Sequence, residues 1–177
     1  MLFRSFRDTL NELNSIGREV RVLESFFIEG DAYRYRQLLR EGRPDWDTAS
    51  IVAPQGALLF ALDLDYAPDP QEKVFRFSPP RQIDFTFDLP SYLRRPVDLF
   101  RIDAEGVHEV KYQVTARGVT VHDNVNRVAI YVVARSRELR GQLEQRRKNL
   151  LAEEASVQFD PASNNADFAT LEAISQP

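Results

Sequence analysis

The chain has 177 residues, 43% hydrophobic and 28% charged, a balance typical of a globular protein with its own core. Its net charge of −4 argues against a general nucleic-acid binder, which needs a concentrated positive surface. The absence of cysteine excludes disulfides, thiolate metal sites and cysteine nucleophiles.

Targeting signals are not evident in the sequence. No apolar run approaches the roughly 18 residues that a membrane span requires. The first ten residues carry charges where a signal peptide would need its apolar stretch, so we expect none. We therefore expect a soluble protein, and the sequence leaves its compartment open.

Residues 1–30 are predicted to form an N-terminal amphipathic helix. Its apolar residues recur at spacings of three and four, which places them on one stripe. The stripe consists of Phe3, Phe6, Leu10, Leu13, Ile16, Val20, Leu23 and Phe27. We expect this stripe to pack within the chain or in a dimer, because so long an apolar face is costly to leave in water. Gly30 and Asp31 mark the end of the helix.

Residues 31–135 are predicted to form an antiparallel β-sandwich of about eight strands. The segment from residue 32 to Leu39 fits a strand or a short helix, and residues 41–47 have the composition of a loop. Strands are expected within 58–66, 75–77, 83–89, 97–102, 110–114, 119–121 and 128–133. The last of these is apolar on both faces, which predicts a central strand.

Residues 136–177 are predicted to form a C-terminal helical extension. Ser136 is a suitable N-cap, and leucines from Leu139 to Leu151 form an apolar stripe among many charges. Asp160 and Pro161 end that helix, and residues 166–174 fit a last short one. The expected fold class is therefore mainly β, with a helix before the sandwich and helices after it.

Four segments in this order carry a family resemblance. They are LNELNSIGREVRVLESFFIEG (10–30), ALLFALDLDY (57–66), FTFDLPSYLRRPVDLFRID (85–103) and EGVHEVKYQVTARGVTVHDNVNRVAIYVVA (105–134). Together they resemble the C-terminal β-sandwich accessory domain, with its preceding helix, of retaining glycoside hydrolases built on a (β/α)8 barrel. The resemblance covers roughly residues 5–134. The barrel that carries the two catalytic carboxylates has no counterpart here, so no catalytic residue can be transferred.

The resemblance implies a non-catalytic accessory domain of a carbohydrate-active protein. Such a domain would stabilise, orient or oligomerise a catalytic barrel, and would touch polysaccharide weakly at its edge. Its partners would be a barrel domain or a second copy of the chain bound through the N-terminal helix. The alternative is a stand-alone protein-interaction or oligomerisation module unrelated to sugars. A small hydrolase with its site spread over loops is the least favoured reading.

Two pairs of aspartates are candidates for a catalytic or calcium site. Asp63 and Asp65 share one face of a strand, as do Asp84 and Asp88 of another. Glycoside hydrolysis uses two carboxylates, and Asp63 with Asp65 could also bind calcium. The acidic loop with its glycine is missing, however, so we favour solvated strand positions for both pairs.

The remaining motifs give no catalytic or cofactor prediction. Zinc needs three or four ligands, and His108 and His122 are the only histidines of the sequence, so exposed strand positions are favoured. Neither a G-x-S-x-G nucleophile elbow nor a glycine-rich phosphate loop occurs. We predict no catalytic residue, no metal and no cofactor.

Glycan contact is the remaining binding hypothesis. Exposed aromatic rings can stack on the apolar face of a sugar. The candidates are Trp46, Tyr33, Tyr35, Tyr66 and Tyr92. Packing at the sandwich edge or against a partner domain is the favoured competing role for these rings, and the phenylalanines are assigned to the core or to the helix stripe.

Overall fold

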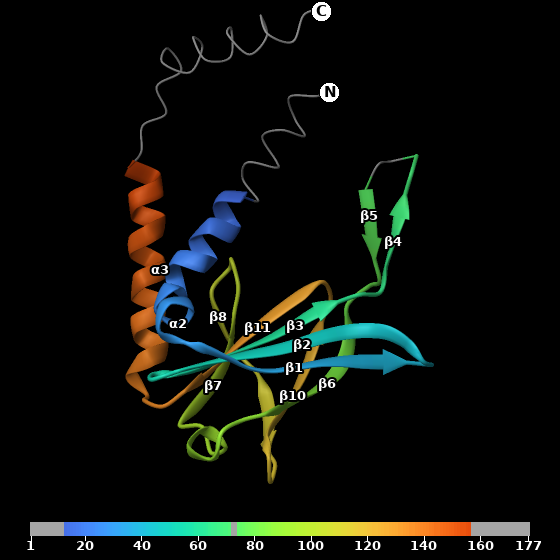
Figure 1. Ribbon diagram of the computed structural model, residues 1–177. Helices are drawn as coiled ribbons and strands as arrows, with labels where there is room; N and C mark the ends of the chain where they lie inside the picture. The colour runs from blue at the N-terminus through green and yellow to red at the C-terminus, as the bar shows by residue number, and fades with distance from the viewer. Residues whose placement is uncertain (1–12, 72–73, 157–177) are drawn as a thin grey trace, which may run out of the picture.

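The computed structural model describes residues 13–71 and 74–156 (Figure 1). Within them, eleven strands form antiparallel sheets, with helical segments before and after them. The predicted fold class, a mainly β antiparallel sandwich flanked by helices, is confirmed. The helix predicted for residues 166–174 lies outside the described residues.

The six-stranded sheet has its strands in the order β1-β2-β3-β11-β7-β8. They are β1 (Asp31–Arg40), β2 (Arg43–Ala53), β3 (Gly56–Asp63), β11 (Val128–Ala134), β7 (Asp98–Ile102) and β8 (Val107–Glu109). The strand predicted to be central is β11, and it lies between β3 and β7 as expected. The segment that fitted a strand or a short helix is the edge strand β1.

The loop predicted for residues 41–47 is wrong. Glu41 and Gly42 alone form a tight turn, both with positive φ (53° and 79°), and β2 begins at Arg43. Proline and charged residues in this segment suggested a loop. In the sheet, one face of β2 packs inward while the other stays partly exposed, and the inward face carries the polar residues Thr48 and Ser50 beside Trp46.

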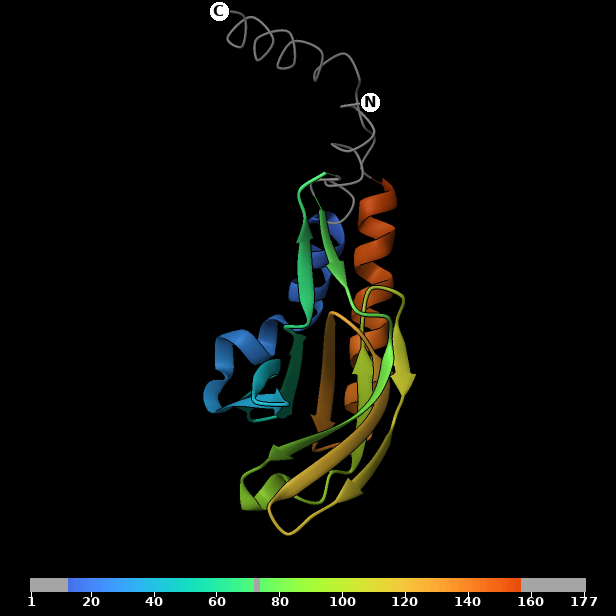
Figure 2. The ribbon, with the colours of Figure 1, turned by 90° about the vertical axis from the view of Figure 1, so that its right-hand side faces the viewer.

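The second sheet has three strands in the order β6-β10-β9. They are β6 (Arg81–Asp88), β10 (Gly118–Val125) and β9 (Lys111–Val114), and a short 3-10 helix (Ser91–Leu93) follows β6. A separate hairpin, β4 (Tyr66–Asp69) with β5 (Val74–Phe77), projects away from both sheets (Figures 1 and 2).

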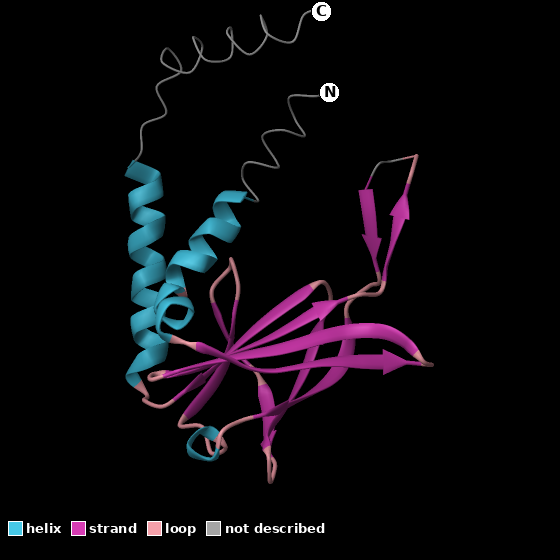
Figure 3. Ribbon diagram, viewed as in Figure 1, coloured by secondary structure: helices cyan, strands magenta, loops and turns pink. Residues whose placement is uncertain are grey.

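Two apolar layers hold the fold together. Between the sheets, the largest buried side chains are Trp46, Phe85 and Tyr131, and all three are fully buried. On the opposite face of the six-stranded sheet, Leu58 and Phe100 pack beneath the helices. The order of layers is therefore helices, large sheet and small sheet, with the helices gathered on one side (Figure 3).

The N-terminal helix is confirmed in the described residues but buries a different face than expected. Residues 13–22 are helical, the chain turns at Leu23, and α2 (Glu24–Glu29) follows. The buried side chains are Val22, Leu23 and Phe26. Of the predicted stripe, Leu23 is buried, whereas Leu13, Ile16, Val20 and Phe27 are 58%, 56%, 50% and 41% exposed. Phe3, Phe6 and Leu10 lie outside the described residues.

The buried residues keep the helical period but lie on a different stripe. Val22 and Phe26 are four residues apart and Leu23 and Phe26 three, whereas Leu13, Ile16 and Val20 all precede the turn at Leu23 and face away from the sheets. The four exposed residues do not pack within the described part of the chain, and the other expected arrangement, packing in a dimer, stays a prediction.

The C-terminal helix α3 (Glu138–Ser156) runs antiparallel to the N-terminal helical residues. Arg18 bonds Glu154 near one end, and Arg146 bonds Glu24 near the other. Arg140 donates two hydrogen bonds, of 2.7 and 2.8 Å, to Asp98 of β7. These bonds lower the pKa of the Asp98 carboxyl. None of the described helices combines the length and apolarity that crossing a membrane requires.

The Asp98–Arg140 pair predicts a pH dependence of stability. Because the pKa of Asp98 is lower in the folded chain than in the unfolded one, its stabilisation is present above the unfolded pKa of about 3.9 and is lost as the pH falls. At pH 7, Asp98→Asn should lower the free energy of unfolding by about 1 kcal/mol in urea titrations. The difference from wild type should shrink below about pH 4. A constant difference down to acidic pH would contradict this.

Two glycines give a matched pair for packing. A Cβ on Gly118 would lie 2.0 Å from the carbonyl oxygen of Phe87, so Gly118→Ala must displace β6 from β10 and should cost about 2–3 kcal/mol. Gly141 lies in α3 with open space around it, so Gly141→Ala should stabilise the fold by up to about 1 kcal/mol through helix propensity. If both substitutions shifted the midpoint of thermal unfolding equally, the close contact between β10 and β6 at Gly118 would be refuted.

Candidate functional site

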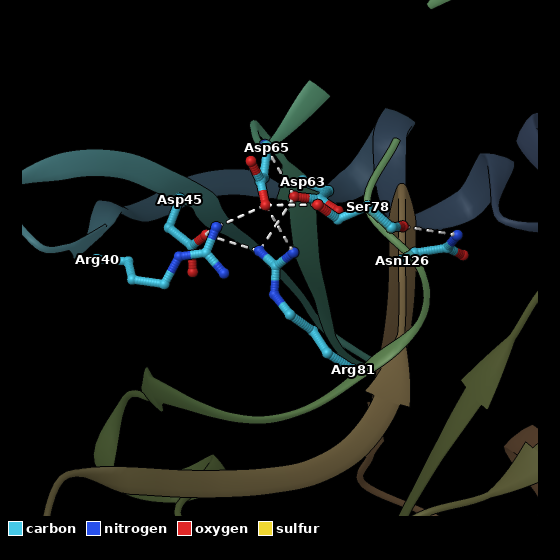
Figure 4. Close-up of polar contacts among 7 residues, drawn as sticks. All are labelled: Arg40, Asp45, Asp63, Asp65, Ser78, Arg81 and Asn126. Atoms are coloured by element: carbon cyan, nitrogen blue, oxygen red, sulfur yellow. Dashed lines mark hydrogen bonds and ion pairs between the residues drawn. The ribbon is translucent and has the colours of Figure 1, made fainter. Parts of the chain in front are cut away.

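The densest polar cluster lies where the two sheets meet at the start of β6 (Figure 4). Arg81 donates to Asp45 of β2 at 2.6 Å and to Asp65, just after β3, at 3.1 Å. Asp63, the last residue of β3, lies 3.4 Å from the same guanidinium. The Arg81 guanidinium also lies 5.5 Å from the centre of the buried Trp46 ring.

Asp63 is the buried member of this cluster. Its side chain is fully buried, and Oδ1 accepts the backbone N–H of Asp65 at 2.9 Å. Its Oδ2 has no hydrogen-bond partner among the described residues. Burying a carboxylate is costly without a nearby cation, so the positive charge of Arg81 stabilises Asp63 in its buried position.

Asp65 completes the cluster nearer the surface. It accepts from the Ser78 hydroxyl at 2.6 Å and from Arg40, and these bonds lower its pKa. Asp63 and Asp65, the candidate catalytic or calcium pair, thus contact arginines. Arg81 contacts both aspartates, and Arg40 contacts Asp65. No group of three acidic, histidine or cysteine side chains among the described residues is arranged to hold a metal. The geometry suits a structural ion network that ties β2, β3 and β6 together.

This network makes a prediction about stability. Arg81→Met leaves Asp63 buried without a counter-charge and should cost about 3–5 kcal/mol in chemical unfolding. Adding Asp63→Asn should recover part of that loss, because the buried charge is removed. Arg76, whose own side chain is 65% exposed and pairs with Asp69, is the control, and Arg76→Met should cost less than about 1 kcal/mol. Similar losses for both arginines would contradict the role given to Arg81.

The other weighed residues form local pairs on the two sheets. His122 Nδ1 lies 2.7 Å from Asp84 on the neighbouring strand, and Asp88 bonds Arg117. His108 Nε2 lies 2.7 Å from Asp103 at the turn before β8. The two histidines belong to different sheets, and both are partly buried where exposure was expected.

Trp46 cannot contact a ligand. The indole is fully buried between the sheets and packs edge-on against Phe85, with ring centres 5.0 Å apart. Its assignment to a polar loop is therefore a mistake. The residues that follow it alternate between part-buried and buried positions to Ser50, but the buried ones are Thr48 and Ser50, so the sequence shows no apolar alternation that would have revealed the strand.

Two of the four candidate tyrosines are exposed but engaged by their own neighbours. The Tyr35 hydroxyl donates to Asp47 at 2.7 Å, which raises the pKa of the phenol. Tyr66 lies in the projecting hairpin, where its ring contacts Phe75 and Phe77 at centre distances of 5.4 and 5.5 Å. The two tyrosines lie on different elements.

Tyr33 and Tyr92 line one groove of about 390 Å³. Tyr33 comes from β1 and Tyr92 from the 3-10 helix, and the acidic residues Glu29 and Asp31 line the same groove. Tyr92 is 57% exposed, and the Arg135 guanidinium lies 5.4 Å from its ring centre. We call these lining residues the tyrosine groove. Aromatic rings beside carboxylates suit a ligand with one apolar face and several hydroxyls.

A larger and more polar groove, of about 630 Å³, was not foreseen from the sequence. It lies between helical residues 15–19 and the turns that follow β7 and β10. Glu19 and Asp103 line it, and burial followed by repulsion from Asp103 raises the pKa of Glu19. Its residues come from four separate parts of the sequence and share no motif, so sequence spacing carried no signal for it.

Comparison with known protein families, characterised proteins and solved structures finds no match to this chain. The resemblance to glycoside hydrolase accessory domains therefore stays a hypothesis based on the sequence pattern. Any function has to be argued from the geometry described above.

Proposed function

We propose that this chain is a non-catalytic accessory β-sandwich domain of a carbohydrate-active protein, and that it contacts glycan weakly through the tyrosine groove. The observation that carries the proposal is the convergence of Tyr33 and Tyr92. Both were candidate glycan contacts from the sequence, and distant elements bring them into one groove with Glu29 and Asp31. The rings would stack on the sugar and the carboxylates would accept its hydroxyls.

The ion network supports a non-catalytic role. Retaining and inverting glycosidases both need two carboxyl groups that face the scissile bond, one of them able to give up a proton. Asp63 and Asp65 instead face arginines, and the lowered pKa of Asp65 keeps it ionised and unable to act as an acid near neutral pH. A domain of this kind would serve a catalytic partner and not carry out the reaction.

Affinity electrophoresis against a panel of plant, algal and microbial polysaccharides tests the proposal. One polysaccharide class should retard the wild-type chain, and Tyr92→Ala or Tyr33→Ala should reduce that retardation at least about fivefold. Tyr66→Ala is the matched control, because Tyr66 is similarly exposed but lies on the projecting hairpin. Loss of retardation in the control alone would place the contact elsewhere, and no retardation by any polysaccharide would refute glycan binding.

A second candidate function is a protein-interaction or oligomerisation module that uses the N-terminal helix. The exposed apolar residues Leu13, Ile16 and Val20, spaced three and four apart on the first helical segment, favour it. Exposed apolar residues gathered on one helix face are typical of surfaces that another protein covers. This reading needs no glycan.

Sedimentation equilibrium of the full chain tests the second candidate. A mass that rises with concentration, and returns to that of one chain in Ile16→Asp/Val20→Asp, would support it. Phe75→Asp is the control, since Phe75 is 64% exposed on the hairpin and not on the helix. A single-chain mass at every concentration would exclude self-association through this face.

A further inference from the structure

Strand β1 forms an open edge of the six-stranded sheet. It is ten residues long and, among the described residues, pairs with β2 alone. The strand at the other end of the sheet, β8, has three residues. A long edge strand presents unpaired backbone N–H and C=O groups to its surroundings, and proteins usually shorten or cover such edges. Figure 1 shows β1 along the border of the sheet.

The side chains of β1 give this edge a positive charge in a chain whose net charge is −4. Arg34 and Arg36 are exposed, and neither forms an ion pair with a described carboxylate. They alternate with Tyr35, which is 65% exposed. Arg34 and Arg36 also line a cleft of about 160 Å³ that separates β1 and β2 from the end of β6.

The regular part of the edge is short and well defined. Register shifts occur between Ala32 and Arg34 and between Leu38 and Leu39, and both interrupt the pairing with β2. Between them, residues 34–38 pair in unbroken antiparallel register. A strand added there would find regular backbone geometry over these residues and both unpaired arginines within its reach.

We propose that the edge of β1 binds an extended acidic segment of another protein as an additional strand. Backbone hydrogen bonds along residues 34–38 would supply affinity, and alternate carboxylates would face Arg34 and Arg36. The opposite charges would also select the partner and speed its encounter. This proposal does not depend on glycan binding.

Charge argues against a second copy of the chain as the occupant. An antiparallel pair of β1 strands would place arginines of one copy beside those of the other, and like charges across a strand pair are destabilising. The competing explanation is protective, because arginine on an edge strand can itself prevent edge-to-edge association. Under that explanation no added strand should bind.

A peptide titration of the isotope-labelled full chain, followed by NMR, separates these explanations. The probe is an acetylated, amidated hexapeptide of alternating glutamate and valine. We expect shift changes centred on residues 34–38 and slower amide hydrogen exchange there. Replacing every glutamate by lysine, or one central residue by proline, should weaken binding at least about tenfold.

Charge reversal in the protein provides the matched test. Arg34→Glu/Arg36→Glu should weaken binding of the acidic probe at least about tenfold and improve binding of the lysine probe. Arg76→Glu, on the projecting hairpin, should leave both affinities unchanged. Both arginines are exposed, so we expect each variant to keep its fold. The NMR signals of residues outside β1 check this.

Several outcomes would overturn the proposal. Failure of the acidic probe to bind at millimolar concentration would assign Arg34 and Arg36 to edge protection. Equal binding of the acidic and lysine probes, or shift changes away from β1, would show that the edge does not select an acidic strand. Self-association abolished by Arg34→Glu/Arg36→Glu would make a second copy the occupant.

Discussion

The six-stranded sheet must be covered on both faces at its centre, and the rest of the structure follows from that constraint. Leu58 and Leu59 are neighbours on β3, point to opposite faces, and are both fully buried. Tyr131 and Val132 repeat the arrangement on β11. A strand that is apolar on both sides cannot face water on either, so one face takes the small sheet and the other takes the helices.

The two faces of the six-stranded sheet are covered by different elements, and polar contacts fix each of these elements to one side of the sheet. The helices are held at the β7 side, where Arg140 bonds Asp98, and the small sheet is tied to β2 and β3 by Arg81. Inside the sandwich, the Tyr131 hydroxyl reaches Asp123 at 3.2 Å, and burial is the first cause of the raised pKa of that phenol. Polar side chains therefore enter the core where a strand ends or a partner is at hand.

The sequence predicted the elements whose pattern comes from burial and missed those whose pattern comes from partners. Strand β11 was identified as central because burial on both faces leaves a continuous apolar run. The strand around Trp46 was mistaken for a loop, since the charges that flank it are satisfied only by residues distant in sequence, such as Arg81 with Asp45. The apolar spacing of the N-terminal segment correctly predicted a helix, but the residues that pack on the sheet are Val22, Leu23 and Phe26 and not the whole predicted stripe.

The sequence predicted which residues belong to the candidate site but not which of them lie together in the structure. Tyr33 and Tyr92 were candidates as aromatic side chains that could be exposed, and nothing in their spacing indicates that the 3-10 helix lies beside the start of β1. Asp63 and Asp65 were expected at solvated positions on one strand, but Asp63 is buried and Asp65 lies beyond the end of β3. Their arginine partners could not be predicted, because Arg40 and Arg81 reach them from β1 and β6.

Strand β1 is where the two proposed binding surfaces meet. Tyr33 lies at the irregularity between Ala32 and Arg34, and there it lines the tyrosine groove. The regular edge begins after it, at Arg34, whose guanidinium lies 5.2 Å from the centre of the Tyr33 ring. An added strand would use that guanidinium and a glycan would use that ring, so the two proposed ligands would meet at the contact between Arg34 and Tyr33.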